Sequence, residues 1–132
     1  MNTATIAECM KLSFADTPFP QVIANLIGAG VCSYTADLAA RRNTYYGTAG
    51  ESFDEPLPLM ASPPIAAAFD KDAVAATVGA IQQGRIGYAE FLVKIMAAGC
   101  ASYSVFIGGR KVMYFGRDGD FHTEHFPAAG KK

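Results

Sequence analysis

The chain has 132 residues, of which 51% are apolar and 17% are charged, and its formal net charge is −1. This composition excludes a disordered or collagen-like chain, and it does not fit the strongly basic composition of most nucleic-acid binders. The length predicts a single domain, 1–132, that can fold without metal ions or disulfides.

The N-terminal stretch has no basic segment followed by an apolar core, so we expect no secretory signal. No run of about 20 apolar residues is present, and we therefore expect no membrane-spanning segment. Cys9, Cys32 and Cys100 are odd in number and far apart, which is typical of reduced thiols. These features predict a cytoplasmic protein.

The first part of the chain predicts two helices followed by three strands. Thr3 or Thr5 can cap an N-terminal helix. A second helix is predicted from an apolar face at Val22, Ile23, Leu26 and Ile27, and Gly30 should end it. Alternating apolar and polar residues then predict strands over residues 33–38, 43–46 and 51–55.

Residues 56–64 contain four of the seven prolines and connect the first part to a second one of the same kind. Asp72 can cap a helix that runs to residue 83, and the next helix should end at Gly99. Strands are predicted over residues 102–107, 112–115 and 120–125. Gly108 and Gly109 are expected to form a two-residue hairpin turn between the first two.

The two parts match each other when the sequence is shifted by 69 residues, which aligns residues 19–58 with residues 88–127 without a gap. Ten aligned positions are identical: Ala29 and Ala98, Gly30 and Gly99, Ser33 and Ser102, Tyr34 and Tyr103, Arg41 and Arg110, Tyr45 and Tyr114, Gly47 and Gly116, Gly50 and Gly119, Glu55 and Glu124, and Pro58 and Pro127. We interpret this as a tandem duplication with repeats of about 1–58 and 70–127.

The predicted fold class is therefore α+β. Each repeat is a helix-helix-three-strand antiparallel unit, and a pseudo-twofold axis relates the two. The helices are expected to pack on one sheet face, because strands that bury only one face need a layer over that face. Whether the strands form one continuous sheet or two facing sheets is left open.

Several segments resemble the YbcV-like family of small bacterial proteins of unknown function, often labelled "phage envelope protein". They are Gln83-Gly84, Tyr88, Glu90-Phe91, Ala98 to Cys100, Tyr103, Gly109-Arg110, Tyr114 to Gly116, Glu124 to Pro127, and, earlier in the chain, Asp37, Arg41-Arg42 and Thr44 to Gly47. The resemblance covers almost the whole chain. It implies no established activity and carries over no site residues.

Asp120, His122 and Glu124 share one face of a predicted strand and could form an acid–base or metal site. His125 lies on the opposite face, so the two histidines cannot chelate one ion together. The first repeat conserves the carboxylates as Glu51 and Glu55 but lacks the histidine. A solvated strand face is the alternative interpretation, and we expect no metal and no cofactor.

Two basic pairs, Arg41-Arg42 and Arg110-Lys111, stand at matching hairpin positions and could form an anion site if symmetry brought them together. Exposed turns that simply carry charge are the alternative. Asp37 lies within a strand opposite Tyr34 and could pair with Arg41 or act as a general base.

The repeated architecture is not accompanied by a repeated catalytic set, and no Walker loop, dinucleotide fingerprint or nucleophile elbow is present. We therefore predict a non-catalytic binding or protein-interaction module, with another protein or a second copy of the chain as partner and no nucleic acid or membrane. The alternatives are a small enzyme using Asp37, Arg41, His122 and Glu124 in a groove between the repeats, or an anion or metabolite-binding protein.

Overall fold

The computed structural model describes residues 1–59 and 63–126, and shows four helices and six strands. The helices are α1 (Thr3–Phe14), α2 (Phe19–Gly28), α3 (Lys71–Gln82) and α4 (Tyr88–Ala97). The strands are β1 (Val31–Asp37), β2 (Arg42–Gly47), β3 (Ser52–Pro56), β4 (Cys100–Phe106), β5 (Lys111–Gly116) and β6 (Phe121–His125). The α+β class is confirmed. The end of the predicted second repeat at Pro127, and part of the Pro-rich connection, lie outside the described residues.

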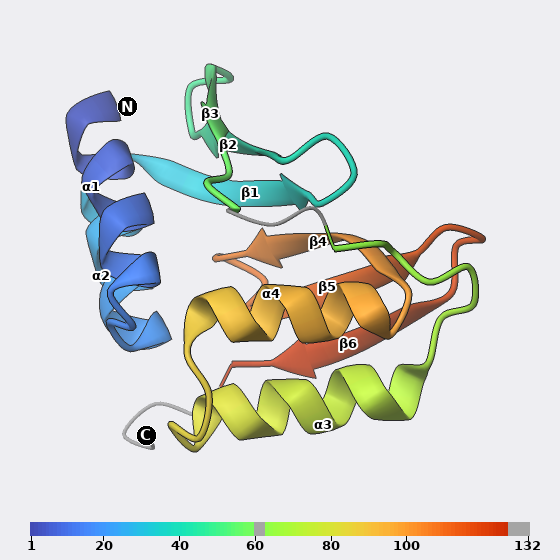
Figure 1. The fold of residues 1–132 in the computed structure, drawn as a ribbon. Helices are drawn as coiled ribbons and strands as arrows, with labels where there is room; N and C mark the ends of the chain where they lie inside the picture. Colours follow the sequence, from blue (N-terminus) through green and yellow to red (C-terminus); the bar gives the residue numbers. More distant parts are fainter. Residues whose placement is uncertain (60–62, 127–132) are drawn as a thin grey trace.

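All six strands form one antiparallel sheet in the order β3-β2-β1-β4-β5-β6 (Figure 1). Four of the strand pairings are hairpins between neighbours in the chain, whereas β1 and β4 join the two parts. At this junction Thr35 is paired with Ser104, and Ser33 and Asp37 are paired with Phe106 and Ser102. This register is symmetric about Thr35 and Ser104, which occupy the same position in the two parts.

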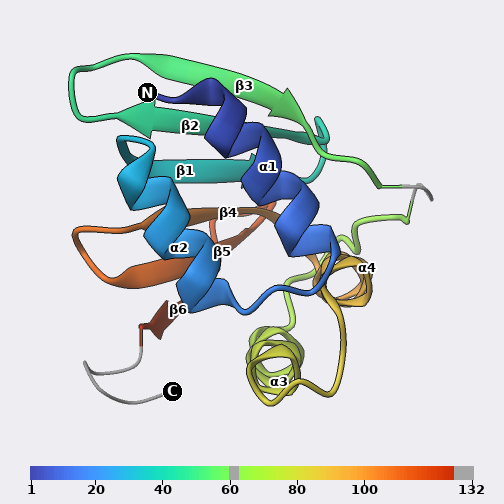
Figure 2. The same cartoon turned by 90° about the vertical axis from the view of Figure 1, so that its left-hand side faces the viewer.

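The four helices lie on the same face of this sheet. Tyr34 and Ala36 of β1 are paired with Val105 and Tyr103 of β4, and all four side chains are buried in the same core. In Figure 2, α1 and α2 cross in front of the strands, with α3 and α4 seen end-on beside them. The Phe91 ring of α4 packs edge-on against Tyr103 and Tyr114. The opposite face of the sheet has no helix of the described chain over it.

The helix ends agree with the predicted glycine stops but not with the predicted N-caps. Gly30 and Gly99 follow α2 and α4 with φ of 89° and 91°, a conformation that favours glycine. Asn2 caps α1 and Asp70 caps α3 through side-chain oxygens, so the predictions of Thr3 or Thr5 and of Asp72 were wrong. Both true caps lie just before the helices, where the backbone is extended.

Apolar spacing located α2 and α4 correctly, with one exception. Val22, Ile23 and Leu26 are buried, but Ile27 is 55% exposed. The four corresponding residues of α4 are all buried: Phe91, Leu92, Ile95 and Met96.

The turn between β4 and β5 differs from the predicted two-residue hairpin. Residues 107–110 form it, and the amide of Arg110 donates to the carbonyl of Ile107. Arg110 has a φ of 54°, and Arg41 has a φ of 58° in the matching β1–β2 turn. An arginine, not a glycine, therefore adopts the left-handed conformation that closes each turn.

Several backbone hydrogen bonds recur at matched positions in the two parts. The amides of Leu57 and Phe126 donate to the carbonyls of Arg41 and Arg110. Across the central junction, the amide of Leu38 donates to Ala101, and that of Ile107 donates to Cys32. The two parts are thus alike in their turns and helix ends as well as in element order.

Candidate functional site

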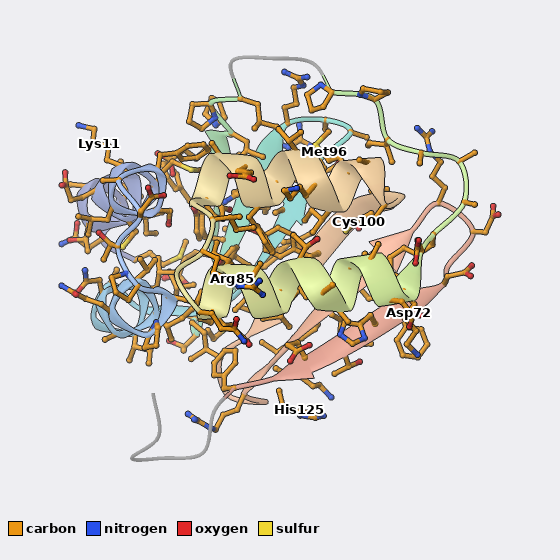
Figure 3. All side chains as sticks on the ribbon, turned by 60° about the horizontal axis from the view of Figure 1, so that its bottom comes forward. Lys11, Asp72, Arg85, Met96, Cys100 and His125 are labelled. Carbon is orange, nitrogen blue, oxygen red and sulfur yellow. The ribbon has the colours of Figure 1, made fainter. Side chains whose placement is uncertain are left out.

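Among the site residues predicted from the sequence, His122 and Glu124 are the pair that lies in contact in the described part of the chain. Nε2 of His122 lies 2.8 Å from Oε2 of Glu124, and the imidazole lies nearly parallel to the ring of Tyr114. Their side chains are 15% and 32% exposed. Both lie on the helix-covered face of β6, because they are paired with the buried Tyr114 and Val112, whereas the labelled His125 projects on the side away from α3 (Figure 3). The predicted separation of the two histidines onto opposite faces is therefore what the structure shows.

Glu55 occupies the matched position in the first part, and its surroundings differ. It is paired across the strands with Asn43, which is 2% exposed. Burial raises the pKa of the Glu55 carboxyl. Within the described chain, Oε1 of Glu55 and Oδ1 of Asn43 have no hydrogen-bond donor, while Nδ2 of Asn43 donates to the Tyr45 hydroxyl. A half-turn of the amide would exchange Oδ1 and Nδ2 and let the Tyr45 hydroxyl donate to Oδ1.

Asp37 does not join His122 and Glu124. Its Oδ1 accepts a hydrogen bond from the amide of Ala40 at 2.9 Å, so the carboxylate stabilises the β1–β2 turn. It lies on the face opposite Ala36, and β4 and β5 separate β1 from β6, a distance of about 14 Å at ordinary strand spacing. No ion pair between Asp37 and Arg41 is found in the described residues.

The two basic pairs also stay apart. Because β1 and β4 are antiparallel, the turns that carry Arg41 and Arg110 lie at opposite ends of the sheet, more than about 13 Å apart along the strands. The guanidinium of Arg110 lies 5.4 Å from the Phe126 ring centre. Arg41 and Arg42, in contrast, line a shallow, open pocket of about 310 Å³ together with Ala40, Asp54, Glu55 and Pro56.

A further shallow pocket, of about 430 Å³, lies beside the β5–β6 turn. Phe69, Lys71, Asp118, Gly119, Asp120 and Phe121 line it. Asp120, predicted to share a site with His122, thus faces this open surface instead. Among residues 1–59 and 63–126, no group of three or more His, Cys, Asp or Glu side chains could hold a metal ion.

Two of the three cysteines are buried in the core. Cys9 and Cys100 are buried, and burial raises the pKa of both thiols, to about 12 for Cys100. The charges of Glu55 and Glu8 raise the pKa of Cys9 further. A thiol with a raised pKa is a poor nucleophile, so these two residues act as small core side chains.

The predicted packing of the helices on one sheet face leaves the other face without a described helix, and the sequence analysis did not single out the side chains that stand there. We call this other face the uncovered face. Its side chains alternate with the buried ones along every strand. They are Ser33, Thr35 and Asp37 of β1; Arg42, Thr44 and Tyr46 of β2; Ser52, Asp54 and Pro56 of β3; Ser102, Ser104 and Phe106 of β4; Lys111, Met113 and Phe115 of β5; and Phe121, Thr123 and His125 of β6.

Four aromatic side chains stand on the uncovered face. Phe121 is 50% exposed and Tyr46 is 42% exposed, whereas Phe106 and Phe115 are partly buried by their neighbours. The signal for some of them was present in the sequence, because Phe106 alternates with the apolar residues Val105 and Ile107, and Tyr46 follows Tyr45 directly. Large apolar side chains at the outward positions of a strand mark a surface that differs from an ordinary solvated one.

Comparison with known protein families shows that this chain matches a family that has no assigned function. A family model described as "Protein of unknown function (DUF1398)" matches residues 8–124, so the chain belongs to that family. The predicted membership of a family of unknown function is confirmed at this level. The match carries neither the YbcV-like name nor the phage-envelope label.

Uncharacterized mycobacterial proteins are similar to this chain. One is from Mycobacterium bovis, and two are from strains of Mycobacterium tuberculosis. Each is 31% identical over 110 residues, which cover 83% of this chain and 67% of the relative. No helix among the described residues is long and apolar enough to cross a membrane.

Proposed function

We propose that the protein is a non-catalytic interaction module that binds another protein chain through the uncovered face. The aromatic side chains on that face carry the proposal, with Phe121 and Tyr46 half exposed on a sheet that the described helices leave open. Aromatic residues are enriched at protein–protein interfaces because they bury much area and lose little conformational entropy. A cytoplasmic location, without nucleic acid, membrane or cofactor, remains part of this proposal.

The positions of the predicted catalytic residues favour binding over catalysis. Asp37 stabilises a turn on one face of the sheet, and His122 and Glu124 lie on the other face under the helices. A general base and its partners must reach one reacting group together. The carboxylates of Asp37 and Glu124 and the imidazole of His122 cannot reach one reacting group together, because the sheet lies between them.

A photo-crosslinking experiment tests the proposal. A photoreactive amino acid replaces Tyr46 in one variant and Phe121 in a second, and the control carries it at Ile27, which is 55% exposed on α2. We expect protein adducts in cells from the first two variants and not from the control. Absence of adducts at both Tyr46 and Phe121 would contradict the proposal.

An anion-binding function is the second candidate, and the pocket at Arg41 and Arg42 supports it. Two guanidinium groups beside about 310 Å³ of open space can bind a carboxylate or phosphate. Asp54 and Glu55 line the same pocket and would repel an anion, which makes this candidate the weaker one. Titration with inorganic phosphate, compared with an Arg41→Gln, Arg42→Gln variant, tests it.

The hypothesis of a tandem duplication, with repeats of about 1–58 and 70–127 within one domain, is supported by the matched turns and by the symmetric pairing of Thr35 with Ser104. The YbcV-like resemblance and its phage label rest on sequence motifs alone. Neither bears on the interaction proposed for the uncovered face.

A further inference from the structure

We propose that the partner of the uncovered face is the same face of a second copy of this chain, packed around a twofold axis parallel to the strands. This inference rests on the proposed interaction function and names its partner.

The strand register arranges the uncovered face in three rows that run across the sheet. The central row is polar at one end and holds a methionine toward the other: Asp54, Thr44, Thr35, Ser104, Met113 and Thr123. The two outer rows are Ser52, Tyr46, Ser33, Phe106, Lys111 and His125, and Pro56, Arg42, Asp37, Ser102, Phe115 and Phe121.

Charge is distributed unequally between the two halves of this face. The half formed by β1, β2 and β3 carries Asp37, Asp54 and Arg42, so its formal charge is −1. The half formed by β4, β5 and β6 carries Lys111 and His125, and no carboxylate stands at its face positions. A partner that places its basic half over the acidic half is therefore favoured.

Apolar side chains are unequally distributed as well. Phe106, Phe115, Phe121 and Met113 stand on the β4–β6 half, and Tyr46 is the large aromatic side chain of the β1–β3 half. One half is thus polar and slightly acidic, while the other is aromatic and basic. In a dimer, both halves of each face gain a complementary partner if the polar, acidic half of one copy covers the aromatic, basic half of the other.

A twofold axis parallel to the strands produces this arrangement. It places β3 of one copy over β6 of the other, and β2 over β5. Tyr46 then faces Lys111 of the second copy, and Arg42 faces Phe115 of the second copy, both of which are favourable cation–aromatic pairs. No two charges of the same sign face each other among the face positions.

An axis across the strands, the other one that keeps the strands of the two copies aligned, is disfavoured. It would place Asp54 directly over Asp54 of the second copy, and two facing carboxylates repel each other. It would also place aromatic half over aromatic half, and leave the acidic halves together. The charge pattern therefore selects one of the two symmetric arrangements.

The face is large enough for a specific dimer. Six strands of five to seven residues span roughly 29 by 17 Å, so that two copies bury about 1,000 Å² in total. This is close to the lower limit for a specific interface. The central hydroxyl groups are already paired within the sheet, Thr35 with Ser104 at 2.9 Å and Thr44 with Asp54 at 2.7 Å, so covering them leaves fewer groups unsatisfied.

Disulfide trapping tests both the partner and the axis. In a Cys32→Ser background, Thr44→Cys and Met113→Cys are made as separate variants, mixed in equal amounts and oxidised. Sheets packed face to face can hold such a bond. We expect a crosslinked product of twice the 14.0 kDa chain mass in the mixture, involving about half of the chains, and little in either variant alone.

Light scattering over a concentration series measures the association without a crosslink. We expect Phe121→Glu to weaken dimerisation at least about tenfold, because it places a charge in the interface. Ile27→Glu is the matched control, since Ile27 is similarly exposed but lies on α2. Thermal unfolding of both variants shows whether they fold.

The outcomes separate this inference from the proposed function. Crosslinking of Thr44→Cys alone would overturn the axis, because that residue faces its own copy only in the other arrangement. A monomer at all concentrations, with protein adducts still formed at Tyr46 in cells, would overturn self-association and leave the interaction function standing with a different partner. A monomer without such adducts would overturn both.

Discussion

Oγ1 of Thr35 and Oγ of Ser104 lie 2.9 Å apart at the centre of the sheet, although 69 residues separate them in the chain. They are directly opposite each other where β1 and β4 meet. The pairing of two equivalent residues makes the sheet symmetric about its midpoint. It also provides natural comparisons, because a change in one part can be tested against the same change in the other.

Replacing Gly99 by alanine should destabilise the fold more than replacing Gly30. Both have φ near +90°, where a side chain costs about 1–2 kcal/mol. A Cβ at Gly99 would also collide with the backbone of Ala68 and lie 2.8 Å from Cα of Phe69, whereas at Gly30 its nearest neighbour is Cα of Met1 at 3.6 Å. Denaturant unfolding should show that Gly99→Ala lowers the free energy of unfolding by at least about 2 kcal/mol more than Gly30→Ala does. Equal losses would mean that the segment before α3 can move away.

Replacing Arg41 by glycine should stabilise the protein, or leave it unchanged, because it removes a left-handed arginine with φ of 58°. Relief of the left-handed strain contributes about 1–2 kcal/mol, and the greater freedom of glycine in the unfolded chain removes about 0.5–1 kcal/mol, so that the net gain is about 0.5–1 kcal/mol. Arg110→Gly relieves the same strain but loses the contact of the guanidinium with Phe126. Chemical unfolding of both variants should therefore rank Arg41→Gly as the more stable. The reverse order would show that Arg41 makes a stabilising contact.

Replacing Tyr88 by phenylalanine should cost about 1–3 kcal/mol, because it leaves the hydroxyl of Tyr103 unpaired in the core. The two hydroxyl oxygens are 2.5 Å apart, and burial raises the pKa of both tyrosines, that of Tyr88 to about 12, so both hydroxyls keep their protons at neutral pH and one donates to the other. Tyr34→Phe is the control, since Tyr34 is a buried tyrosine at the position that matches Tyr103, and removing its hydroxyl breaks no hydrogen bond found in the described chain. A cost for Tyr34→Phe as large as that for Tyr88→Phe would contradict this account.

Replacing Glu55 by glutamine should make stability depend less on pH. Burial raises the pKa of Glu55, so the folded protein retains this proton at a pH where the unfolded chain has lost it. Stability from this group is present below the ordinary glutamate pKa and is lost as pH rises through the folded pKa. Glu55→Gln should therefore be more stable than the wild type at pH 7, by less than about 1 kcal/mol because the residue is only partly buried.

Glu51 provides a control of opposite sign. Its own backbone amide and the N-terminal ammonium hold the pKa of its carboxyl below the usual value, with the amide of Ala49 adding to the effect. Stability from Glu51 is thus present above the ordinary glutamate pKa and is lost as pH falls. Thermal unfolding between pH 3 and 7 should show both glutamine variants diverging from the wild type as pH rises toward 7, but in opposite directions: Glu55→Gln becomes the more stable and Glu51→Gln the less stable. The same trend in both would contradict the assigned causes.

The helices and most strands could be predicted because their signals are local. The apolar spacing of Phe91, Leu92, Ile95 and Met96 marks a buried helical face, and Gly99 ends that helix through its own conformation. The turn at Arg110 could not be predicted in this way. Non-glycine residues at positive φ are uncommon, and the adjacent Gly108 and Gly109 favoured a shorter turn.

The candidate site was harder to predict because it depends on how strands are ordered. Alternation shows that His122 and Glu124 share a face, and they do. It does not show that β1 pairs with β4, and this pairing decides that Asp37 is remote and that the two arginine turns lie at opposite ends. The uncovered face follows from the same ordering, so its extent becomes visible only once the six strands are joined.

The single junction between the halves also has a kinetic consequence. Four of the five strand pairings are local hairpins, and each can form as soon as its own segment of chain is available. The pairing of β1 with β4 must instead close a loop of about 69 residues, which carries a larger entropic cost. We therefore expect each half to gain its hairpins early, and the rate of folding to be set by the meeting of Thr35 and Ser104.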